Sequence, residues 1–272
     1  MQQISQYIQA GVGEATRLAG VAQTEITKAA QQNNVNSPLP SDFSSEVEKA
    51  TKILSVFTVQ DLEKPGNTVS NIIPRDIIKK AKGLAVFTIF KAGMFWSGQV
   101  GSGVVIARLE DSDEWSPPSC ISIGGLGFGM QMGADVSDFV IILNTPEAVK
   151  AFSRGENVTL GGNLSVTAGP VGVGKSVSGT ILEGAPTALY SYSKSKGLFA
   201  GVSVNGTILI ERKDANKAFY KKDVTAEQIL TGQVEVPEGQ NISELIEVIK
   251  KAESVEIPEE TETETETSAT IG

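Results

Sequence analysis

The chain has 272 residues, no histidine and one cysteine, Cys120. This composition excludes Ser-His-Asp and Cys-His catalysis, histidine-ligated zinc, an intrachain disulfide and a CxxC metal site. The net charge of −9 comes mainly from residues 253–272, which hold seven acids and no base. The rest of the chain has 25 acids against 23 bases and is nearly neutral. A nearly neutral domain does not have the basic surface of a general nucleic-acid binder.

Residues 1–36 are expected to form an N-terminal helical extension. They lack the cationic and continuous apolar regions of a secretory signal. No apolar run approaches the roughly 20 residues of a membrane-spanning helix, so we expect a cytoplasmic protein with peripheral membrane contacts. The extension carries a weak apolar stripe at helical spacing, formed by Ile4, Ile8, Ala15, Leu18, Ala22 and Ile26.

Six further helices are predicted from apolar periodicity and capping residues. In residues 145–155, Thr145 is a suitable N-cap and Pro146 suits the first helical position. The longest helix, from about residue 41 to 57, is amphipathic, with an apolar face formed by Phe43, Val47, Ala50, Leu54 and Phe57. The other four are expected at 74–83, 214–220, 225–231 and 243–252.

The middle of the chain is rich in glycine and predicts strands. Residues 83–206 hold 21 of the 28 glycines and contain many short runs in which apolar and polar residues alternate. This pattern indicates strands that bend, bulge or approach other backbones closely. Asn205-Gly206 predicts a tight hairpin turn. We therefore expect an α+β fold: a curved antiparallel sheet or barrel-like core with flanking helices.

The segment GPVGVGKS (169–176) matches the phosphate-binding P-loop pattern, in which Lys175 would contact phosphate and Ser176 would bind magnesium. A true P-loop follows a buried strand and precedes a helix. Here both flanks alternate in the manner of strands, so a β-hairpin is the favoured interpretation and a nucleotide-hydrolysing enzyme the third alternative for function.

Other candidate chemical groups have simpler structural explanations. GGLGFGMQMG (124–133) fits no dinucleotide-binding spacing and is predicted to be a glycine-rich strand. Asp135 and Asp138 are predicted to be turn or cap residues before a strand. Cys120 lacks a histidine partner and is predicted to be an inert, half-buried thiol. No catalytic residue, metal ligand or cofactor is expected.

Clustered lysines could form a surface for an acidic partner. Such clusters are often solvated faces, and the alternative is a patch for phosphoinositide headgroups or for an acidic filament. The candidate residues for membrane or actin binding are Lys49, Lys52, Lys79, Lys80, Lys82 and Lys91. A second basic group comprises Lys213, Lys217, Lys221 and Lys222.

Three strings of residues, DFVIILN (138–144), YSKSKGLFAGVS (192–203) and ERKDAN (211–216), are highly specific. With the surrounding strands, they make residues 38–232 resemble the SYLF domain, typified by fungal actin-binding proteins of endocytic cortical patches. The resemblance implies a non-enzymatic domain that binds phosphoinositide membranes and, in fungal members, binds and bundles actin filaments. It also implies a location at the cell cortex, in actin patches or on endocytic membranes.

The sequence departs from the family in the helix at 38–57. In family members this helix is rich in lysine and helps to engage membrane. Here it carries only Lys49 and Lys52 as bases, against Asp42, Glu46 and Glu48. Each missing base forgoes about 1 kcal/mol near an anionic leaflet, so strong electrostatic binding to membrane is not expected. The alternative function is a lipid-binding module without actin activity, which the nearly neutral composition of residues 1–252 and the expected lack of a recruitment domain favour.

The expected organisation has four parts. The helical extension at 1–36 precedes the SYLF-type domain at 38–232, a C-terminal helix at 233–252 and a disordered acidic tail at 253–272. Many fungal relatives continue into a Src-homology-3 domain that recruits an actin-nucleation factor, and no such domain is expected in this chain. The expected partners are actin filaments and phosphoinositide membranes, not nucleic acid.

Overall fold

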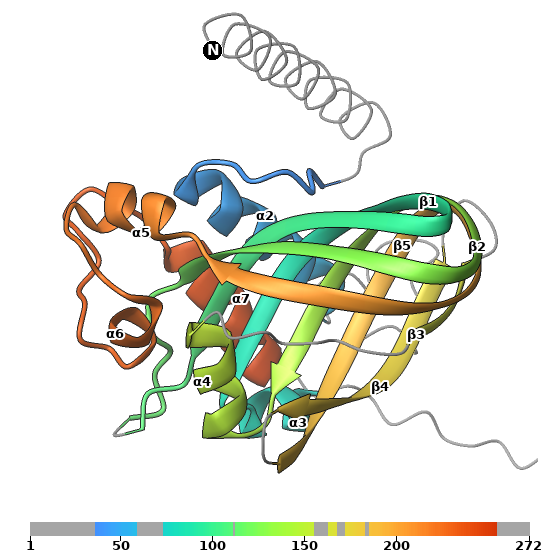
Figure 1. Ribbon diagram of the computed structural model, residues 1–272. Coiled ribbons are helices and arrows are strands. Elements are labelled where there is room, and N and C mark those ends of the chain that lie inside the picture. The colour runs from blue at the N-terminus through green and yellow to red at the C-terminus, as the bar shows by residue number, and fades with distance from the viewer. Residues whose placement is uncertain are drawn as a thin grey trace, which may run out of the picture.

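The computed structural model describes residues 36–58, 73–110, 112–154, 163–167, 172–182 and 185–254. The predicted helix within residues 1–35 and the acidic tail from residue 255 onward lie outside the described residues. The described strands form one sheet, and the described helices gather around one end of it (Figure 1).

All pairings between the strands are antiparallel. β1 (Gly83–Ala107) pairs with β2 (Ser119–Leu143), which pairs with β5 (Ala185–Glu211), and both β3 (Asn163–Thr167) and β4 (Gly172–Leu182) pair with β5. Among the described strands, the order β1-β2-β5-β3 does not return to β1, so the sheet is curved but open. The predicted α+β class, with a glycine-rich antiparallel sheet and flanking helices, is confirmed.

The long strands bend strongly at the end of the sheet that lies away from the helices (Figure 1). The register between β1 and β2 shifts here, because one residue, Phe95, separates Met94 from Trp96 while three residues of β2 separate their partners Met132 and Phe128. Phe95 has a φ of 62°. A bulge of this kind bends a strand and increases its twist. A Cβ added to the neighbouring Gly93 would lie 2.0 Å from the carbonyl oxygen of Trp96, so this tight bend requires glycine there.

Beyond the bend, the second half of β1 returns against the first half. The backbone N–H of Arg108 donates to the carbonyl oxygen of Lys82 at 2.9 Å. A Cβ added to Gly103 would lie only 2.1 Å from the carbonyl oxygen of Val86. The close approach of the two halves therefore depends on a position without a side chain.

Both faces of the sheet are buried near the helices. In β1, Leu84 and Val86 belong to one hydrophobic cluster and Ala85 and Phe87 to the other, which explains the continuous apolar run at 84–87. α4 (Pro146–Arg154) packs into the cluster of Phe87. The cluster of Leu84 and Val86 also contains residues of α2 (Phe43–Val56), α3 (Arg75–Lys80), α5 (Lys213–Tyr220) and α7 (Ser243–Ser254). α6 (Ala226–Leu230) contributes residues to both clusters.

The six predicted helices are present, with ends within three residues of the expected positions. Local capping explains this agreement. The carboxylate of Asp42 accepts a hydrogen bond from the N–H of Ser45, and the Thr145 hydroxyl accepts one from Ala148 at 3.2 Å. Thr225 and Gln228 form a capping box at the start of α6. No described helix is long and apolar enough to cross a bilayer.

Two predictions about turns are wrong. Asn205 and Gly206 form no hairpin turn, because β5 continues through them and pairs them with Gly127 and Leu126 of β2. Asp135 and Asp138 are not turn or cap residues: they lie inside β2, opposite Lys91 and Thr88 of β1. In both cases long-range strand pairing overrides a local turn signal.

The second part of the P-loop-like segment, residues 172–176, belongs to strand β4. Lys175 and Ser176 lie in β4, where they pair with Tyr192 and Ser191 of β5. β4 and β5 are joined between Leu182 and Ala185 and form a hairpin, in agreement with the favoured interpretation. No helix follows Lys175 and Ser176 in β4, as a P-loop would require.

Candidate binding surfaces

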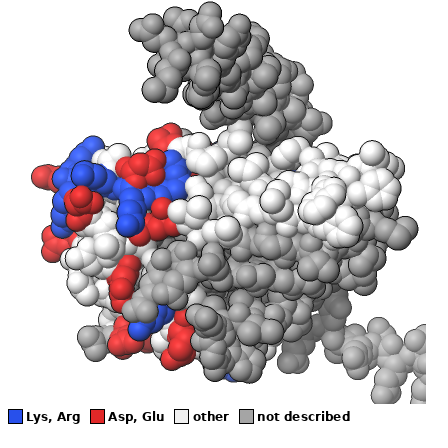
Figure 2. Space-filling model, in the orientation of Figure 1, with Lys and Arg blue, Asp and Glu red and all other residues white. Residues whose placement is uncertain are grey.

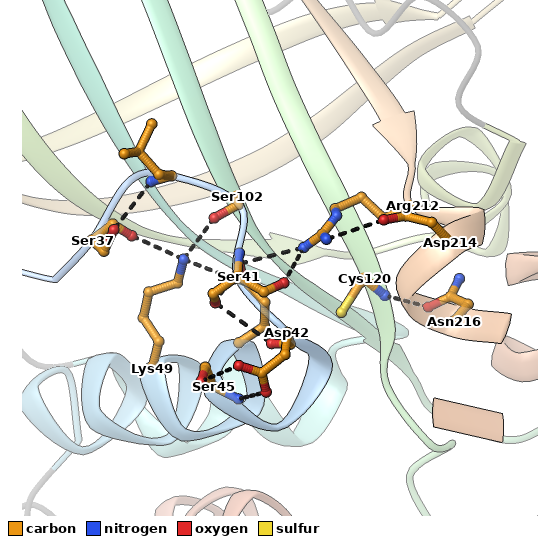
Figure 3. A network of polar contacts seen from close by, with 12 residues as sticks. Ser37, Ser41, Asp42, Ser45, Lys49, Ser102, Cys120, Arg212, Asp214 and Asn216 are labelled. Carbon is orange, nitrogen blue, oxygen red and sulfur yellow. Dashed lines mark hydrogen bonds and ion pairs between the residues drawn. The ribbon is translucent and has the colours of Figure 1, made fainter. Parts of the chain in front are cut away.

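A buried group of charged side chains joins the start of α2 to the sheet and to α5 (Figure 3). The Lys49 ammonium lies 2.7 Å from Oε2 of Glu46 and donates to the hydroxyl of Ser102 in β1 at 2.8 Å. Glu46 also accepts hydrogen bonds from the N–H and hydroxyl of Ser41, and Arg212 Nη1 lies 3.7 Å from Oε1 of Glu46. These contacts fix the position of α2 on the sheet.

Lys49 and Lys91, two of the six predicted binding lysines, are not surface residues. Lys49 is 7% exposed and Lys91 is 9% exposed. Desolvation lowers the pKa of both, although Glu46 beside Lys49 and Asp135 beside Lys91 act in the opposite direction. Their positive charges are therefore turned toward internal carboxylates and away from any external partner.

The apolar face of α2 is also turned inward. Phe43, Val47, Ala50, Leu54 and Phe57 are all buried in the larger hydrophobic cluster. Phe43 stacks on Phe219 of α5 with ring centroids 3.7 Å apart. In this arrangement the face packs against protein, and it could reach a membrane only if α2 left the core.

The exposed members of the predicted set are Lys52, Lys79, Lys80 and Lys82. Lys52 pairs with Glu48 at 2.7 Å, whereas the other three form no ion pair with a described carboxylate. Lys79 and Lys80 are the last two residues of α3, and Lys82 immediately precedes β1. We refer to Lys79, Lys80 and Lys82 as the α3 lysines.

A second basic group surrounds α5. Lys213, Lys217, Lys221 and Lys222 are exposed, but acids lie among them, and Lys217 pairs with Asp223 at 3.2 Å. Figure 2 shows blue and red side chains intermingled at this helical end of the molecule. The local charge is therefore less uniformly positive than that of the α3 lysines.

An open cleft of about 1070 Å³ lies between the end of β1, α4 and α6. Its lining includes three bases and four acids from the described residues: Lys82, Arg108, Lys150, Glu110, Asp113, Glu147 and Glu227. An anionic headgroup would meet more negative than positive side chains there. The cleft is consequently a poor phosphate site, although Lys82 lies at its edge.

The described residues offer neither a reactive thiol nor a cluster of metal ligands. Burial raises the pKa of the Cys120 thiol, which disfavours the reactive thiolate; the residue is fully buried rather than half-buried as predicted. No group of three or more potential metal-ligating side chains occurs in the part of the chain that the structure describes.

An exposed apolar surface at the bend of the sheet was not anticipated from the sequence. Six large apolar side chains, each between 57% and 71% exposed, form what we call the apolar tip: Met94, Phe95, Trp96, Leu126, Phe128 and Met132. The rings of Trp96 and Phe128 lie 4.7 Å apart, and Met94 is opposite Met132. Uncharged runs in the sequence around these positions would have been the available signal.

Comparison with known proteins identifies relatives in fungi and animals. A family model described as "Ysc84: Las17-binding protein actin regulator" matches residues 124–252. "SH3 domain-containing protein PJ696.02" of Schizosaccharomyces pombe is 46% identical over 205 residues, which are 75% of this chain and 46% of that protein. "LAS seventeen-binding protein 3" of Saccharomyces cerevisiae is 48% identical over 75% of this chain and 43% of that protein.

An animal relative shows similar conservation. The human "SH3 domain-containing YSC84-like protein 1" is 46% identical over 79% of this chain and 60% of that protein. The chain thus spans roughly half the length of the relatives it matches. No solved structure matches the chain. The family model and the extended identity to these three proteins show that the chain belongs to the Ysc84 family of SYLF-domain proteins.

Proposed function

We propose that the chain is a non-enzymatic binding protein that engages actin filaments and phosphoinositide membranes, in endocytosis or cortical actin organisation. The description of the family as "Las17-binding protein actin regulator" and the name of the yeast relative, "LAS seventeen-binding protein 3", support an actin-related role. We infer a peripheral location at the cell cortex, in actin patches or on endocytic membranes.

The observation that carries the proposal is the group of α3 lysines. Lys79, Lys80 and Lys82 are exposed beside the first strand and form no ion pair with a described carboxylate. Both a filament with an acidic surface and a phosphoinositide membrane would attract such a group. The intermingled acids around α5 make that second group the weaker candidate.

Co-pelleting with actin filaments and with phosphoinositide vesicles, each over increasing salt, tests the proposal. The double variant Lys79→Gln/Lys80→Gln should bind roughly tenfold or more weakly, since each base contributes about 1 kcal/mol near an anionic surface. The matched control is Lys250→Gln/Lys251→Gln, which removes two adjacent exposed lysines from the last turns of α7. Equal losses in both variants, or no loss in either, would refute a specific role for the α3 lysines.

A lipid-binding module without actin activity is the second candidate. The nearly neutral composition outside the acidic segment and the pairing of Lys52 with Glu48 favour modest electrostatic binding. Vesicle binding without filament binding would select this candidate. Magnesium-dependent nucleotide binding that Lys175→Ala abolishes would instead support the third alternative, which the strand conformation of Lys175 disfavours.

A further inference from the structure

The apolar tip includes three consecutive exposed side chains of β1. In a strand with one face on a core, exposed and buried side chains alternate, but at this register shift Met94, Phe95 and Trp96 are all exposed. Phe95 has a φ of 62°, which is unusual for a bulky residue. Strained backbone of this kind is concentrated at functional sites.

The strands around the tip carry no charge. No acidic or basic residue occurs in 92–107 of β1, 119–134 of β2 or 197–210 of β5, although 20% of the whole chain is charged. The nearest charges on β1 and β2, Lys91 and Asp135, lie opposite each other and are buried. In Figure 2 the described surface at this end is white, in contrast to the charged helical end. Exposed apolar surface of this extent marks an interaction site.

We propose that the apolar tip inserts into the boundary between the headgroups and the acyl chains of a lipid bilayer. The tip lies where the sheet bends and is therefore convex, and a fluid apolar phase accepts protruding side chains without a complementary pocket. Trp96 has an apolar body and a polar N–H, a combination that favours the membrane interface. The lack of lysine and arginine at the tip means that this contact would not select anionic lipids.

This contact is distinct from the α3 lysines and rests on the proposed function only in requiring a membrane partner. Met94 lies eleven positions along β1 from Gly83, the residue next to Lys82, which is roughly 36 Å at about 3.3 Å per residue. Screening at physiological salt acts over about 8 Å. With the tip inserted in a bilayer, the α3 lysines would lie away from the lipid contact and could bind a filament.

The fluorescence of Trp96 in the full-length chain tests insertion. The chain has two tryptophans, and both the wild type and Trp96→Phe keep the buried Trp115. Subtracting the emission of Trp96→Phe from that of the wild type therefore leaves the emission of Trp96. We expect this difference emission to shift to the blue on addition of phosphatidylcholine vesicles, with or without phosphoinositide, and to be quenched by lipids brominated on the acyl chains. The shift should persist at high salt and in Lys79→Gln/Lys80→Gln.

Vesicle flotation of variants provides a second readout. Phe95→Ser/Phe128→Ser should reduce partitioning into phosphatidylcholine vesicles by roughly tenfold or more, given the value of burying two aromatic side chains. Tyr190→Ser, at another exposed aromatic residue of the sheet, is the matched control and should leave partitioning unchanged. Circular dichroism would verify that both variants remain folded.

Three outcomes would overturn the proposal. An unchanged Trp96 emission with vesicles would show that the tip does not insert, and continued pelleting with phosphoinositide vesicles would then leave the proposed function intact. A blue shift that depends on protein concentration without vesicles would identify a second copy as the occupant of the tip. Emission that is already blue-shifted in dilute protein alone would show that another segment of the chain covers it.

Discussion

Glu46 and Lys49 place two opposite charges inside the protein at the start of α2. Withdrawing ions from water is costly, and burial lowers the pKa of Lys49 even though Glu46 lies 2.7 Å away. The pair therefore determines where α2 sits more than it adds to stability, because either charge without the other would be uncompensated.

We expect Glu46→Gln to lower the free energy of unfolding by about 3–5 kcal/mol, since it leaves the Lys49 ammonium without its carboxylate. Adding Lys49→Met should recover much of this loss; the remainder, about 1 kcal/mol, reflects the Ser102 hydroxyl left without its partner. Urea unfolding of the two single variants and the double variant measures the coupling. Strictly additive losses would show that the two charges do not interact.

Asp135 gives a dependence of stability on pH. Burial raises the pKa of its carboxyl above the ordinary value of 3.8, while the hydrogen bond from Ser137 and the charge of Lys91 lower it less strongly. Between the unfolded and folded pKa values, the folded protein binds more protons, so this contribution is fully present below pH 3.8 and is lost as the pH rises through the folded pKa.

The expected result is that wild-type stability, relative to Asp135→Asn, decreases between acidic and neutral pH. Urea midpoints of both proteins, measured at several pH values across this range, give the difference. A wild-type advantage that grows with pH would mean that the attraction between the charges of Asp135 and Lys91 outweighs the cost of burial.

At the scale of elements, the bent form of β1 depends on the close approach of its two halves. A Cβ on Gly103 would lie 2.1 Å from a backbone oxygen of the first half, whereas a Cβ on Gly124 of β2 would meet no atom within 4 Å. We expect Gly103→Ala to destabilise the protein by at least about 2 kcal/mol through steric overlap. Gly124→Ala should be neutral or slightly stabilising, because alanine restricts the unfolded chain. Thermal unfolding of the two variants tests the contrast, and equal stabilities would contradict the described packing.

The helices were predictable from the sequence because their signals are local. Asp42 and Thr225 cap helices within three residues of themselves, and apolar periodicity indicated the buried face of α2. The strands were predictable as a class, but their lengths and partners were not. Asn205 and Gly206 have the chemistry of a turn, and only the pairing with β2 determines that β5 continues through them.

The candidate site was less predictable. Lysine is seldom buried, so the sequence suggested that Lys49 and Lys91 were exposed, and only the fold reveals the carboxylates beside them. The apolar tip escaped prediction for the opposite reason, since apolar residues in strands are ordinarily buried. Its exposure follows from the bend at Phe95, a feature of tertiary structure.

At the scale of the whole molecule, charge and apolar surface lie at opposite ends. The helical end carries the α3 lysines and the mixed charges around α5, and the bend of the sheet carries the apolar tip (Figures 1 and 2). If the tip contacts lipid and the lysines contact a filament, a single domain can hold the two together. This arrangement requires no catalysis.

Flotation of actin filaments with phosphatidylcholine vesicles, which carry no net charge to attract the α3 lysines, tests this arrangement most directly. The account predicts that filaments float only when the protein is present, that Lys79→Gln/Lys80→Gln floats without them, and that Phe95→Ser/Phe128→Ser leaves both filaments and protein largely at the bottom of the gradient. Wild-type protein that floats with vesicles while filaments stay at the bottom would contradict it.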